Sequence, residues 1–462
     1  MPVARRRAVP IVAAAATLLA AAAPQAGAAE ERNPADVQAL TRAYNASGQM
    51  LFRQFAGSHF AGSRFAGGPG NIVFSPYSIG TAMAMALAGT RGETEREMAA
   101  VLQHTLGRTQ INDANAAAMA ILNGYDKSDT APACPPGMRL AGERCEAEPD
   151  ADTGCPFPAS RVGETCVATP RFPPSAKLLV ANALMLAGGQ VAKKYAALLK
   201  DRYSTEVFRR AKLDTVNGWV RERTEGKIET IIEKLSDVIL VNAVYFKSRW
   251  AVAFNKKLTK DEFFSLTRSR QELVPTMLQR TSHAVVSRER YRAIRLPYAV
   301  RSLAMVIALP NEVDGLGDVA RRIDMDELTQ MLAALQKAPA RPVSLMLPRF
   351  KAEYSADLKD LFHKAGMTLP FDLHRSDFSG LTGLAPQTAP TAIDQIVHRA
   401  VIEVSEESTE AAAATAIGIR ITSAMPKPVQ PLQFRVDRPF LYYIVDDTTG
   451  AVLFQGRVVD PR

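Results

Sequence analysis

The sequence lacks the motifs that would identify a common class of enzyme. Its 462 residues contain no HExxH zinc motif, no GxSxG nucleophile turn, no P-loop and no dinucleotide-binding fingerprint. The histidines show none of the spacings that bind a metal: His59, His104, His283, His363, His374 and His398. We therefore expect a protein that is not an enzyme and that holds no metal or cofactor.

Long hydrophobic runs are missing except near the N-terminus. There, Arg5, Arg6 and Arg7 precede an apolar run from about Ala8 to Ala23, and the small residues of 26–28 follow it. This order is typical of a cleaved signal peptide, which we place at residues 1–28. No later segment approaches the eighteen or so apolar residues that a membrane-spanning helix needs. We expect an exported protein, extracellular or periplasmic, that has no membrane segment after the signal is removed.

Cysteine is scarce, and all of it falls in one short region rich in proline and glycine. Cys134 to Cys145 and Cys155 to Cys166 have the same internal spacing, and a Gly-Glu-x-Cys pattern recurs 21 residues later. In an exported chain we favour two local disulfides, although four cysteines permit three pairings. Zinc binding is the alternative, but the paired Cys-x-x-Cys spacing is absent. We interpret residues 128–174 as a duplicated module inserted into a larger domain.

Positive charge is in excess but scattered. The formal net charge is +9, and the spacing of Arg288, Arg290 and Arg292 puts them on one face of an expected strand over 284–298. A solvated face explains this pattern most simply, and a polyanion site is the weaker alternative. Because no nucleic-acid-binding motif accompanies it, we expect no nucleic acid partner.

Hydrophobic residues make up 47% of the chain and charged residues 22%, which is ordinary globular composition. Helical periodicity dominates the first half of the sequence, over 35–66, 94–106, 112–122 and, interrupted by Gly226, 215–235. Strand patterns dominate the second half, over 284–298, 302–309, 343–350, 396–404, 441–445 and 452–459. This separation predicts an α+β fold instead of alternating βαβ units.

Residues 401–426 look like a strand that is kept out of its sheet. From Thr409 the side chains alternate, with Glu410 and Arg420 on the face opposite Thr409 and Ile417. Such alternation is what a half-buried strand needs. The small residues Ala411–Ala414 would let the segment slide between two existing strands. An alanine-rich helix or an ordinary edge strand is the alternative.

Several motifs, in order along the chain, resemble the serpin family. They are Asn71-Ile72-Val73-Phe74-Ser75-Pro76-Tyr77-Ser78, Gly89-Thr90-Arg91-Gly92-Glu93-Thr94, Val241-Asn242-Ala243-Val244-Tyr245-Phe246-Lys247 with Trp250, Leu347-Pro348-Arg349-Phe350, Ser376-Asp377-Phe378-Ser379-Gly380, and Arg438-Pro439-Phe440 to Phe454-x-Gly456. The resemblance covers residues 35–462 except for the cysteine module. It implies one serpin domain over 29–462, with a large central mixed β-sheet, two further sheets, about eight or nine helices and an exposed reactive-centre loop at 406–430.

The resemblance implies an inhibitor that traps a serine protease. The protease cuts the loop and forms an acyl-enzyme, and the cut loop then enters the central sheet as a new strand. We expect a monomer that is an irreversible suicide-type inhibitor of an extracellular protease. A non-inhibitory serpin that acts as a binding or chaperone protein is the alternative.

Site residues follow from the same resemblance. Ser75, Ser78, Asn242 and His398 resemble the shutter network beneath the insertion slot, while Trp250, Arg349 and Glu406 resemble the breach at its top. The hinge would comprise Glu406, Glu407, Ser408, Thr409, Glu410, Ala411, Ala412, Ala413 and Ala414. Counting seventeen residues from Glu406 places the scissile bond between Thr422 and Ser423, which predicts an elastase-like or subtilisin-like target.

Three further features bear on the target, the mechanism and the cofactor. Arg420 is an alternative cleavage site that would indicate a trypsin-like target. Ser408 stands where inhibitory serpins usually have glycine, and serine reaches fewer backbone conformations. Helix 99–106 carries no basic cluster of the kind that heparin-binding relatives use, so no glycosaminoglycan cofactor is implied.

Overall fold

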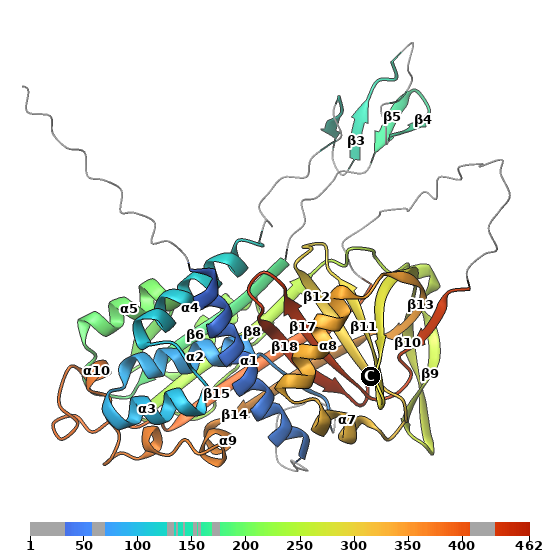
Figure 1. Cartoon of the computed structure of the whole chain (residues 1–462). Coiled ribbons are helices and arrows are strands. Elements are labelled where there is room, and N and C mark those ends of the chain that lie inside the picture. The colour runs from blue at the N-terminus through green and yellow to red at the C-terminus, as the bar shows by residue number, and fades with distance from the viewer. Residues whose placement is uncertain are drawn as a thin grey trace, which may run out of the picture.

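The computed structural model describes residues 33–57, 70–126, 134, 137–141, 144–150, 155, 159–168, 176–406 and 430–462. In these residues the chain forms three β-sheets and ten α-helices (Figure 1). The expected mixture of a large mixed sheet, two further sheets and surrounding helices is confirmed. The helix count exceeds the expected eight or nine, partly because α9 (Lys359–Lys364) and α10 (Ser379–Thr382) are too short for a periodic pattern to reveal.

Four helices come first along the chain: α1 (Pro34–Gly57), α2 (Pro76–Gly89), α3 (Gly92–Val101) and α4 (Arg108–Asn123). Every residue of α2 is buried, which explains its apolar sequence. The helix begins sharply because Ser75 caps it, accepting a hydrogen bond from the Ser78 backbone N–H at 3.0 Å, and Pro76 occupies the first turn. The polar end of α2 is thereby fixed inside the protein.

A five-stranded sheet lies beneath these helices. Its strands, in spatial order, are β14 (Phe350–Asp357), β15 (Gln395–Val404), β8 (Val238–Ser248), β6 (Ala176–Leu186) and β7 (Glu206–Arg209). The central pair, β15 and β8, is parallel and in continuous register from Gln395 opposite Ile239 to Ile402 opposite Phe246. The outer neighbours β14 and β6 are antiparallel to that pair. The sheet is therefore mixed.

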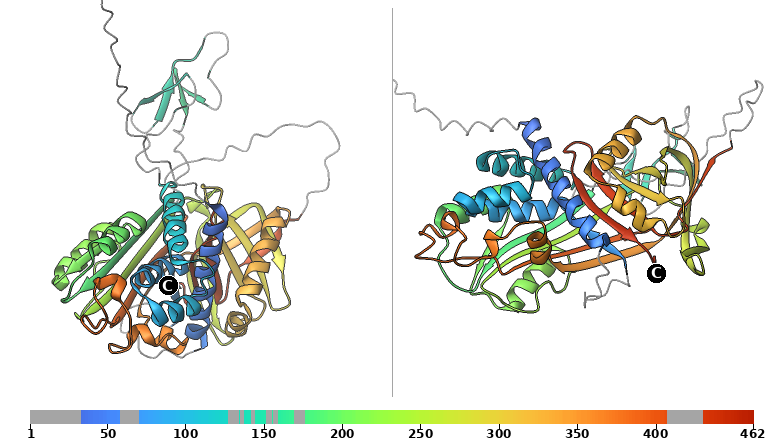
Figure 2. Two further views of the ribbon diagram at one scale, coloured as in Figure 1. Left: turned by 60° about the vertical axis from the view of Figure 1, so that its left-hand side comes forward. Right: turned by 60° about the horizontal axis from the view of Figure 1, so that its bottom comes forward.

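Strand β8 is apolar on both faces because both are covered. Leu240 and Val244 belong to the main core with α2, whereas Ile239 and Val241 pack in a second cluster with Val216 of α6 (Leu213–Arg223). Figure 2 shows the blue N-terminal helices gathered on one face of the sheet. Strands buried on both faces read as continuous hydrophobic runs, as this one does.

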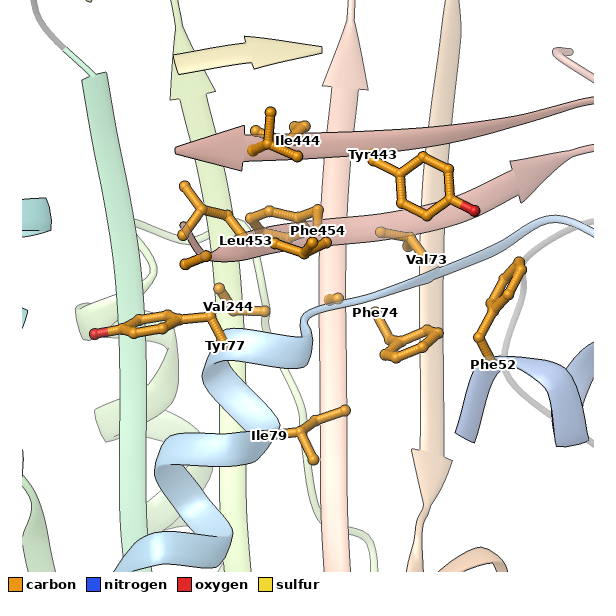
Figure 3. Packing of buried hydrophobic residues seen from close by; sticks show 14 of the residues in the cluster. Phe52, Val73, Phe74, Tyr77, Ile79, Val244, Tyr443, Ile444, Leu453 and Phe454 are labelled. Carbon is orange, nitrogen blue, oxygen red and sulfur yellow. The ribbon is translucent and has the colours of Figure 1, made fainter. Parts of the chain in front are cut away.

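A nine-stranded sheet completes the body. Eight of its strands follow the order β1 (Ile72–Phe74), β18 (Val452–Val458), β17 (Phe440–Asp446), β12 (Leu303–Pro310), β11 (Tyr291–Pro297), β10 (Arg270–Ser287), β13 (Arg341–Pro348) and β16 (Leu432–Arg435), and β9 (Lys260–Thr267) pairs with β10. Aromatic side chains join this sheet to α1 and α2, among them Phe52, Phe74 and Phe454 (Figure 3). The two large sheets thus share one core.

Two expected elements are wrong in detail. The strand expected over 284–298 is the hairpin of β10 and β11, and Arg288 and Arg290 lie in its turn, so the arginines do not line one strand face. The helix expected over 215–235 ends at Arg223, because Glu225 and Gly226 adopt φ values of +52° and +75°. A left-handed backbone terminates a helix.

The remaining helices lie on the periphery: α5 (Lys193–Tyr203), α7 (Leu316–Arg322), α8 (Met325–Lys337) and the single-turn 3₁₀ segments Lys256–Leu258 and Leu369–Phe371. In the described part of the chain, no helix is long and apolar enough to cross a membrane. The proposed signal peptide, 1–28, lies outside the described residues.

The cysteine region forms a small sheet of its own, with the order β2 (Arg139–Ala141), β3 (Arg144–Ala147), β5 (Thr165–Ala168) and β4 (Ser160–Val162). The favoured disulfides are present, Cys134–Cys145 and Cys155–Cys166. Cys145 pairs across the sheet with Ala168, and Ala147 pairs with Cys166. Cys145 and Cys166 are equivalent positions of the two repeats, and so are Ala147 and Ala168. The two pairs are exchanged when the repeats are exchanged, so a local pseudo-twofold axis relates the repeats.

Candidate functional site

The candidate site follows the seam between β8 and β15. A row of three polar residues crosses the sheet in register, with Asn242 opposite Asn182 of β6 on one side and opposite His398 of β15 on the other. All three are at most 3% exposed. Buried polar groups need partners, so this row must be internally satisfied.

His398 uses both of its ring nitrogens in hydrogen bonds within this row and to α2. Its Nε2 accepts a hydrogen bond from the Ser75 backbone N–H at 3.3 Å, so the proton of the neutral ring sits on Nδ1. The Nδ1–H then donates to Asn242 Oδ1. Complete burial lowers the pKa of His398 to about 3, so the ring is neutral at physiological pH. A charged ring could not accept from Ser75.

Asn242 links the sheet to helix α2. Its amide nitrogen donates to the Ser78 backbone carbonyl at 3.0 Å and to Ser78 Oγ at 2.6 Å, and it also donates to Asn182 Oδ1. The structure therefore brings together the four residues expected as the shutter, Ser75, Ser78, Asn242 and His398. Asn182 completes the network and was not expected. Its only signal is that it is the one polar residue in the apolar run 178–186.

A second polar cluster lies where β15 ends. Trp250 donates from its indole Nε1 to the Ser405 carbonyl at 3.0 Å and stacks on Tyr298 with ring centroids 4.6 Å apart. The Trp250 ring therefore holds the residue before Glu406 against the core. Trp250 was expected at this place, and its contact with residue 405 shows how it fixes the chain there.

Glu406 and Arg349 form the expected ion pair. Arg349 Nε lies 2.6 Å from Glu406 Oε2, and Nη2 lies 2.6 Å from Oε1, which is a bidentate arrangement. Thr259, which the sequence did not reveal, donates its hydroxyl to the same carboxylate. The Glu406 side chain is 1% exposed while that of Arg349 is 44% exposed. Burial acts to raise the pKa of Glu406, but the hydrogen bonds from Arg349 and Thr259 outweigh it and hold the pKa below its usual value.

A cavity of about 200 Å³ opens beside this cluster. It is bounded by the ends of β8 and β15 and by Trp250 and Tyr298, with Ser248 and Ser405 among its lining residues. The β8–β15 seam is thus tightly packed around Asn242, and the cavity lies at the end of the seam near Ser248 and Ser405. A segment that separates the two strands would meet least resistance from this side.

The remaining site residues lie outside the described part of the chain. This holds for the hinge from Glu407 to Ala414, including Ser408, Thr409 and Glu410, and for the proposed scissile residues Thr422 and Ser423 and the alternative Arg420. Within the described residues no group of three or more histidine, cysteine or acidic side chains could hold a metal, and the four cysteines are disulfide-bonded.

Comparisons with known proteins agree with this architecture. A family profile described as serpin (serine protease inhibitor) matches residues 48–143 and 158–461. A serine protease inhibitor of Cyanea capillata is 28% identical over 405 residues, which cover 85% of this chain and 92% of the relative. Human leukocyte elastase inhibitor is 30% identical over 406 residues, covering 85% and 93%. The chain belongs to the serpin family.

Solved structures show the same fold. Native protease nexin-1 with heparin superimposes with a TM-score of 0.71 at 24% identity, covering 93% of this chain and all of that one. Human thyroxine-binding globulin superimposes with a TM-score of 0.69 at 21% identity, covering 92% and 99%. The family profile leaves residues 144–157 unmatched, and these fall within the cysteine region.

Proposed function

We propose that the protein is an irreversible inhibitor of an extracellular serine protease and that it traps the acyl-enzyme by inserting its cleaved loop between β8 and β15. The observation that carries this proposal is the direct parallel pairing of those two strands. Chain leaving the end of β15 after Glu406 can turn back between them. A strand placed there would run antiparallel to both neighbours, which is the stronger pairing.

Insertion would replace one ladder of backbone hydrogen bonds by two. The existing ladder joins eight residue pairs. Each additional backbone hydrogen bond is worth about 1 kcal/mol net, so a second ladder of similar length, with burial of Ile417 and Ile419, supplies on the order of 10 kcal/mol. That free energy would drive the displacement of a protease tethered to the loop.

The loop sequence supports insertion. Thr409, Ala411 and Ala413 fall on the face that would point into the core, and Glu410 falls on the outer face. The proposed hinge starts at the cavity beside Trp250, where the seam is least packed. The shutter of Ser75, Ser78, Asn242 and His398 would then reorganise as the strand passes.

The specificity of the inhibitor would depend on the cleaved bond. We place that bond between Thr422 and Ser423, which favours an elastase-like or subtilisin-like protease, with Arg420 and a trypsin-like protease as the alternative. Pro426 disfavours cleavage after Met425, because a proline nitrogen has no N–H to offer a protease.

Export agrees with this role. The proposed signal peptide at 1–28 and the two disulfides both fit an oxidising compartment outside the cytoplasm. We propose a monomer with one serpin domain over 29–462, interrupted by the module of 128–174. The Tyr125 carbonyl accepts a hydrogen bond from the Ala176 N–H at 2.9 Å, so the two ends of the insertion meet.

A binding or chaperone role on the same fold is the second candidate. Ser408 favours it, because a residue stiffer than glycine at the hinge slows insertion. The similarity to thyroxine-binding globulin, solved with its ligand, shows that this fold also occurs in a binding protein.

One experiment separates the two candidates. The mature protein is incubated with a panel of serine proteases, and denaturing gels and mass spectrometry then identify any covalent adduct and its cleaved bond. An inhibitor gives a stable adduct linked at Thr422 or Arg420. Complete loop cleavage with no adduct for any protease would contradict inhibition and favour the binding role.

A further inference from the structure

The position of Trp250, which contacts the Ser405 carbonyl at the end of the seam, is set by the chain segment that carries it. This segment, 249–259, leads from β8 to β9. Trp250 lines two cavities, the one of about 200 Å³ beside the seam and a second of about 30 Å³. Unfilled space beside a ring removes packing contacts that would otherwise fix it. The hydrogen bonds that hold the segment are therefore important for where Trp250 lies.

One of these hydrogen bonds comes from Gln279 of β10, which is 7% exposed. Its side-chain Nε2 donates to the carbonyl of Val252, two residues beyond Trp250. Because a carbonyl oxygen can only accept a hydrogen bond, the amide nitrogen of Gln279 must face Val252, and Oε1 must face away from it. Gln279 thus ties β10 to the segment that carries Trp250.

His283, four residues further along β10, fixes the orientation of the Gln279 amide. Its Nε2 lies 2.7 Å from Gln279 Oε1. Since that oxygen is an acceptor, Nε2 carries the proton of the neutral ring and Nδ1 carries none. The Nδ1 atom is buried and has no hydrogen-bond partner in the part of the chain that the structure describes. A chain of contacts therefore runs from His283 through Gln279 and Val252 to Trp250.

The surroundings of His283 oppose a positive charge on its ring. The residue is 5% exposed, and the cavity of about 30 Å³ beside it is lined by Trp250, Phe254 and Leu296 among others. Burial lowers the pKa of His283, and the Arg295 backbone carbonyl, which acts to raise it, only partly offsets that effect. The ring is therefore neutral at physiological pH.

The charged groups on the neighbouring elements do not offset this cost. Arg341 of β13 lies directly opposite His283, and its side chain is exposed. The side chain of Arg295 in β11 lies on the other face of the sheet, where it pairs with Asp447 beside α8. Residues 250–254 include no charged side chain. Both charged residues that flank His283 in register are thus arginines, and neither can stabilise an imidazolium.

From these contacts we propose that Gln279 and His283 are positioning residues for Trp250, and that protonation of His283 loosens the closed structure, in which Trp250 contacts the end of β15. A charged ring is stabilised by water. Val252 lines the cavity of about 30 Å³ and is 50% exposed, so movement of the segment at Val252 would admit water and break its bond with Gln279. Acid would therefore open the entrance to the seam.

The pH at which this happens follows from the direction of the pKa shift. An imidazole exposed to water titrates at about pH 6.5, and the pKa of His283 is lower in the closed structure. The stabilisation of the closed structure is therefore complete above about pH 6.5 and is lost progressively as the pH falls below it. The pKa of Glu406 is lowered in the fold, so its ion pair with Arg349 persists in this range. Loosening above about pH 5 would thus come from a histidine and not from Glu406.

Tryptophan fluorescence of the uncut mature protein tests this directly. The chain has two tryptophans, so in a Trp219→Phe background the emission comes from Trp250 alone. Between about pH 7.5 and about pH 5 we expect the emission to shift to longer wavelength, because the ring gains contact with water. His283→Gln keeps a donor for Gln279 but does not titrate, and it should abolish the shift. His104→Gln, at another histidine whose pKa is lowered by burial, is the matched control and should keep it.

A variant of Gln279 separates positioning from a general loss of stability. Gln279→Met removes the bond to the Val252 carbonyl, so at neutral pH we expect hydrogen exchange over 250–254 to be about tenfold faster, with unchanged exchange over α2. The emission of Trp250 should already be shifted at neutral pH and should respond little to acid. An unchanged emission of the starting protein over this pH range, or an equal shift in His283→Gln, would overturn the proposal.

The effect on inhibition rests on the proposed insertion of the loop, and protease reactions measure it separately. If the loop inserts, acid should increase the fraction of cleaved molecules that form adducts, by about twofold to fivefold more in the unchanged protein than in His283→Gln. Comparison at each pH cancels the pH dependence of the protease. A His283-dependent emission shift without adducts would support the positioning role and contradict inhibition. Adducts without that shift would contradict the positioning role while inhibition stands.

Discussion

Two polar clusters lie on the same seam of the five-stranded sheet, and they are built differently. At the middle of the seam, Asn242 and His398 form a neutral network that is sealed under the N-terminus of α2. At its end, Glu406 and Arg349 form a charged pair beside a cavity of about 200 Å³. The end cluster should therefore separate more easily, because the half-exposed Arg349 side chain can move into solvent without opening the core. Opening of the seam should begin at Glu406 and reach Asn242 only after the pairs near Ile402 have separated.

We expect the largest effect on inhibition at Thr409, which would be the first core-facing residue of the inserted strand to pass the end cluster. Thr409→Arg puts a charge on the face that would be buried, so insertion should stop and the protein should become a substrate. We expect adduct formation on denaturing gels to be lost while the loop is still cut. Glu410→Arg, on the outer face, is the matched control and should still form adducts. If Thr409→Arg forms adducts as well, the assignment of faces is wrong.

Removal of the middle cluster should cost global stability. Asn242→Ala leaves His398 Nδ1–H and the Ser78 carbonyl without their partner, and we expect a loss of about 3 kcal/mol in the free energy of unfolding. Asn182→Ala removes a single bond and should cost about 1 kcal/mol. Urea denaturation measures both. Equal losses would show that the row is not centred on Asn242.

Acid should act on the middle cluster before it acts on the end cluster. The pKa of His398 is lowered to about 3 in the fold, whereas an unfolded histidine titrates near 6.5, so its contribution to stability is complete above pH 6.5 and declines as pH falls toward 3. Between pH 6.5 and 5 the loss is about 2 kcal/mol.

His398→Gln should remove that part of the pH dependence of urea denaturation. The half-buried His104 and the buried His283, whose pKa values are also lowered by loss of water contact, account for a remaining slope. His363→Gln makes the same substitution at an exposed position in α9, outside the network, and is the matched control. An unchanged slope in His398→Gln would show that the ring titrates normally.

The smallest effect is expected at the end cluster. Arg349→Met removes the charged partner of the buried Glu406 carboxylate but leaves the hydrogen bond from Thr259. Because Arg349 is half exposed, we expect a loss of only about 1 kcal/mol in the free energy of unfolding. The change should be local, with faster hydrogen exchange over 402–406 and unchanged exchange over 396–400. Arg349→Lys keeps the charge, and its hydrogen exchange over 402–406 should be intermediate between that of Arg349→Met and that of the unchanged protein. Faster exchange along all of β15 would contradict stepwise opening.

Acidification below about pH 4.5 should have the same local effect as Arg349→Met. The pKa of Glu406 is lowered in the fold, so its contribution is present above the unfolded value and is lost as the pH falls through the folded one.

Much of this site could be predicted from the sequence because its residues lie in contiguous motifs. Ser75 and Ser78 flank a proline at a helix start, and Asn242 lies in a long apolar strand. Asn182 and Thr259 could not be predicted, because each is recognisable only through a partner far away in the chain. Cross-strand register, which the sequence does not encode locally, brings Asn182 opposite Asn242, and the end of the 3₁₀ segment Lys256–Leu258 places Thr259 beside Glu406.

The errors in the fold have a similar cause. The apolar pattern of 284–298 continues through both strands of the hairpin, and the turn at Arg288–Arg290 contains neither glycine nor proline to mark it. The helix that begins at Leu213 ends where Glu225 adopts a positive φ, which glutamate does not signal. The disulfide pairs were correctly favoured because the repeat spacing made each loop local.

In the proposed mechanism, the five-stranded sheet is a strained form whose relaxed partner has one more strand. The most direct measurement is the melting temperature of the protein before and after the loop is cut once within 417–425. We predict a rise of tens of degrees on cleavage, because the cut form gains a strand along the β8–β15 seam. An unchanged melting temperature, with complete cleavage verified by mass spectrometry, would contradict insertion of the loop into the sheet.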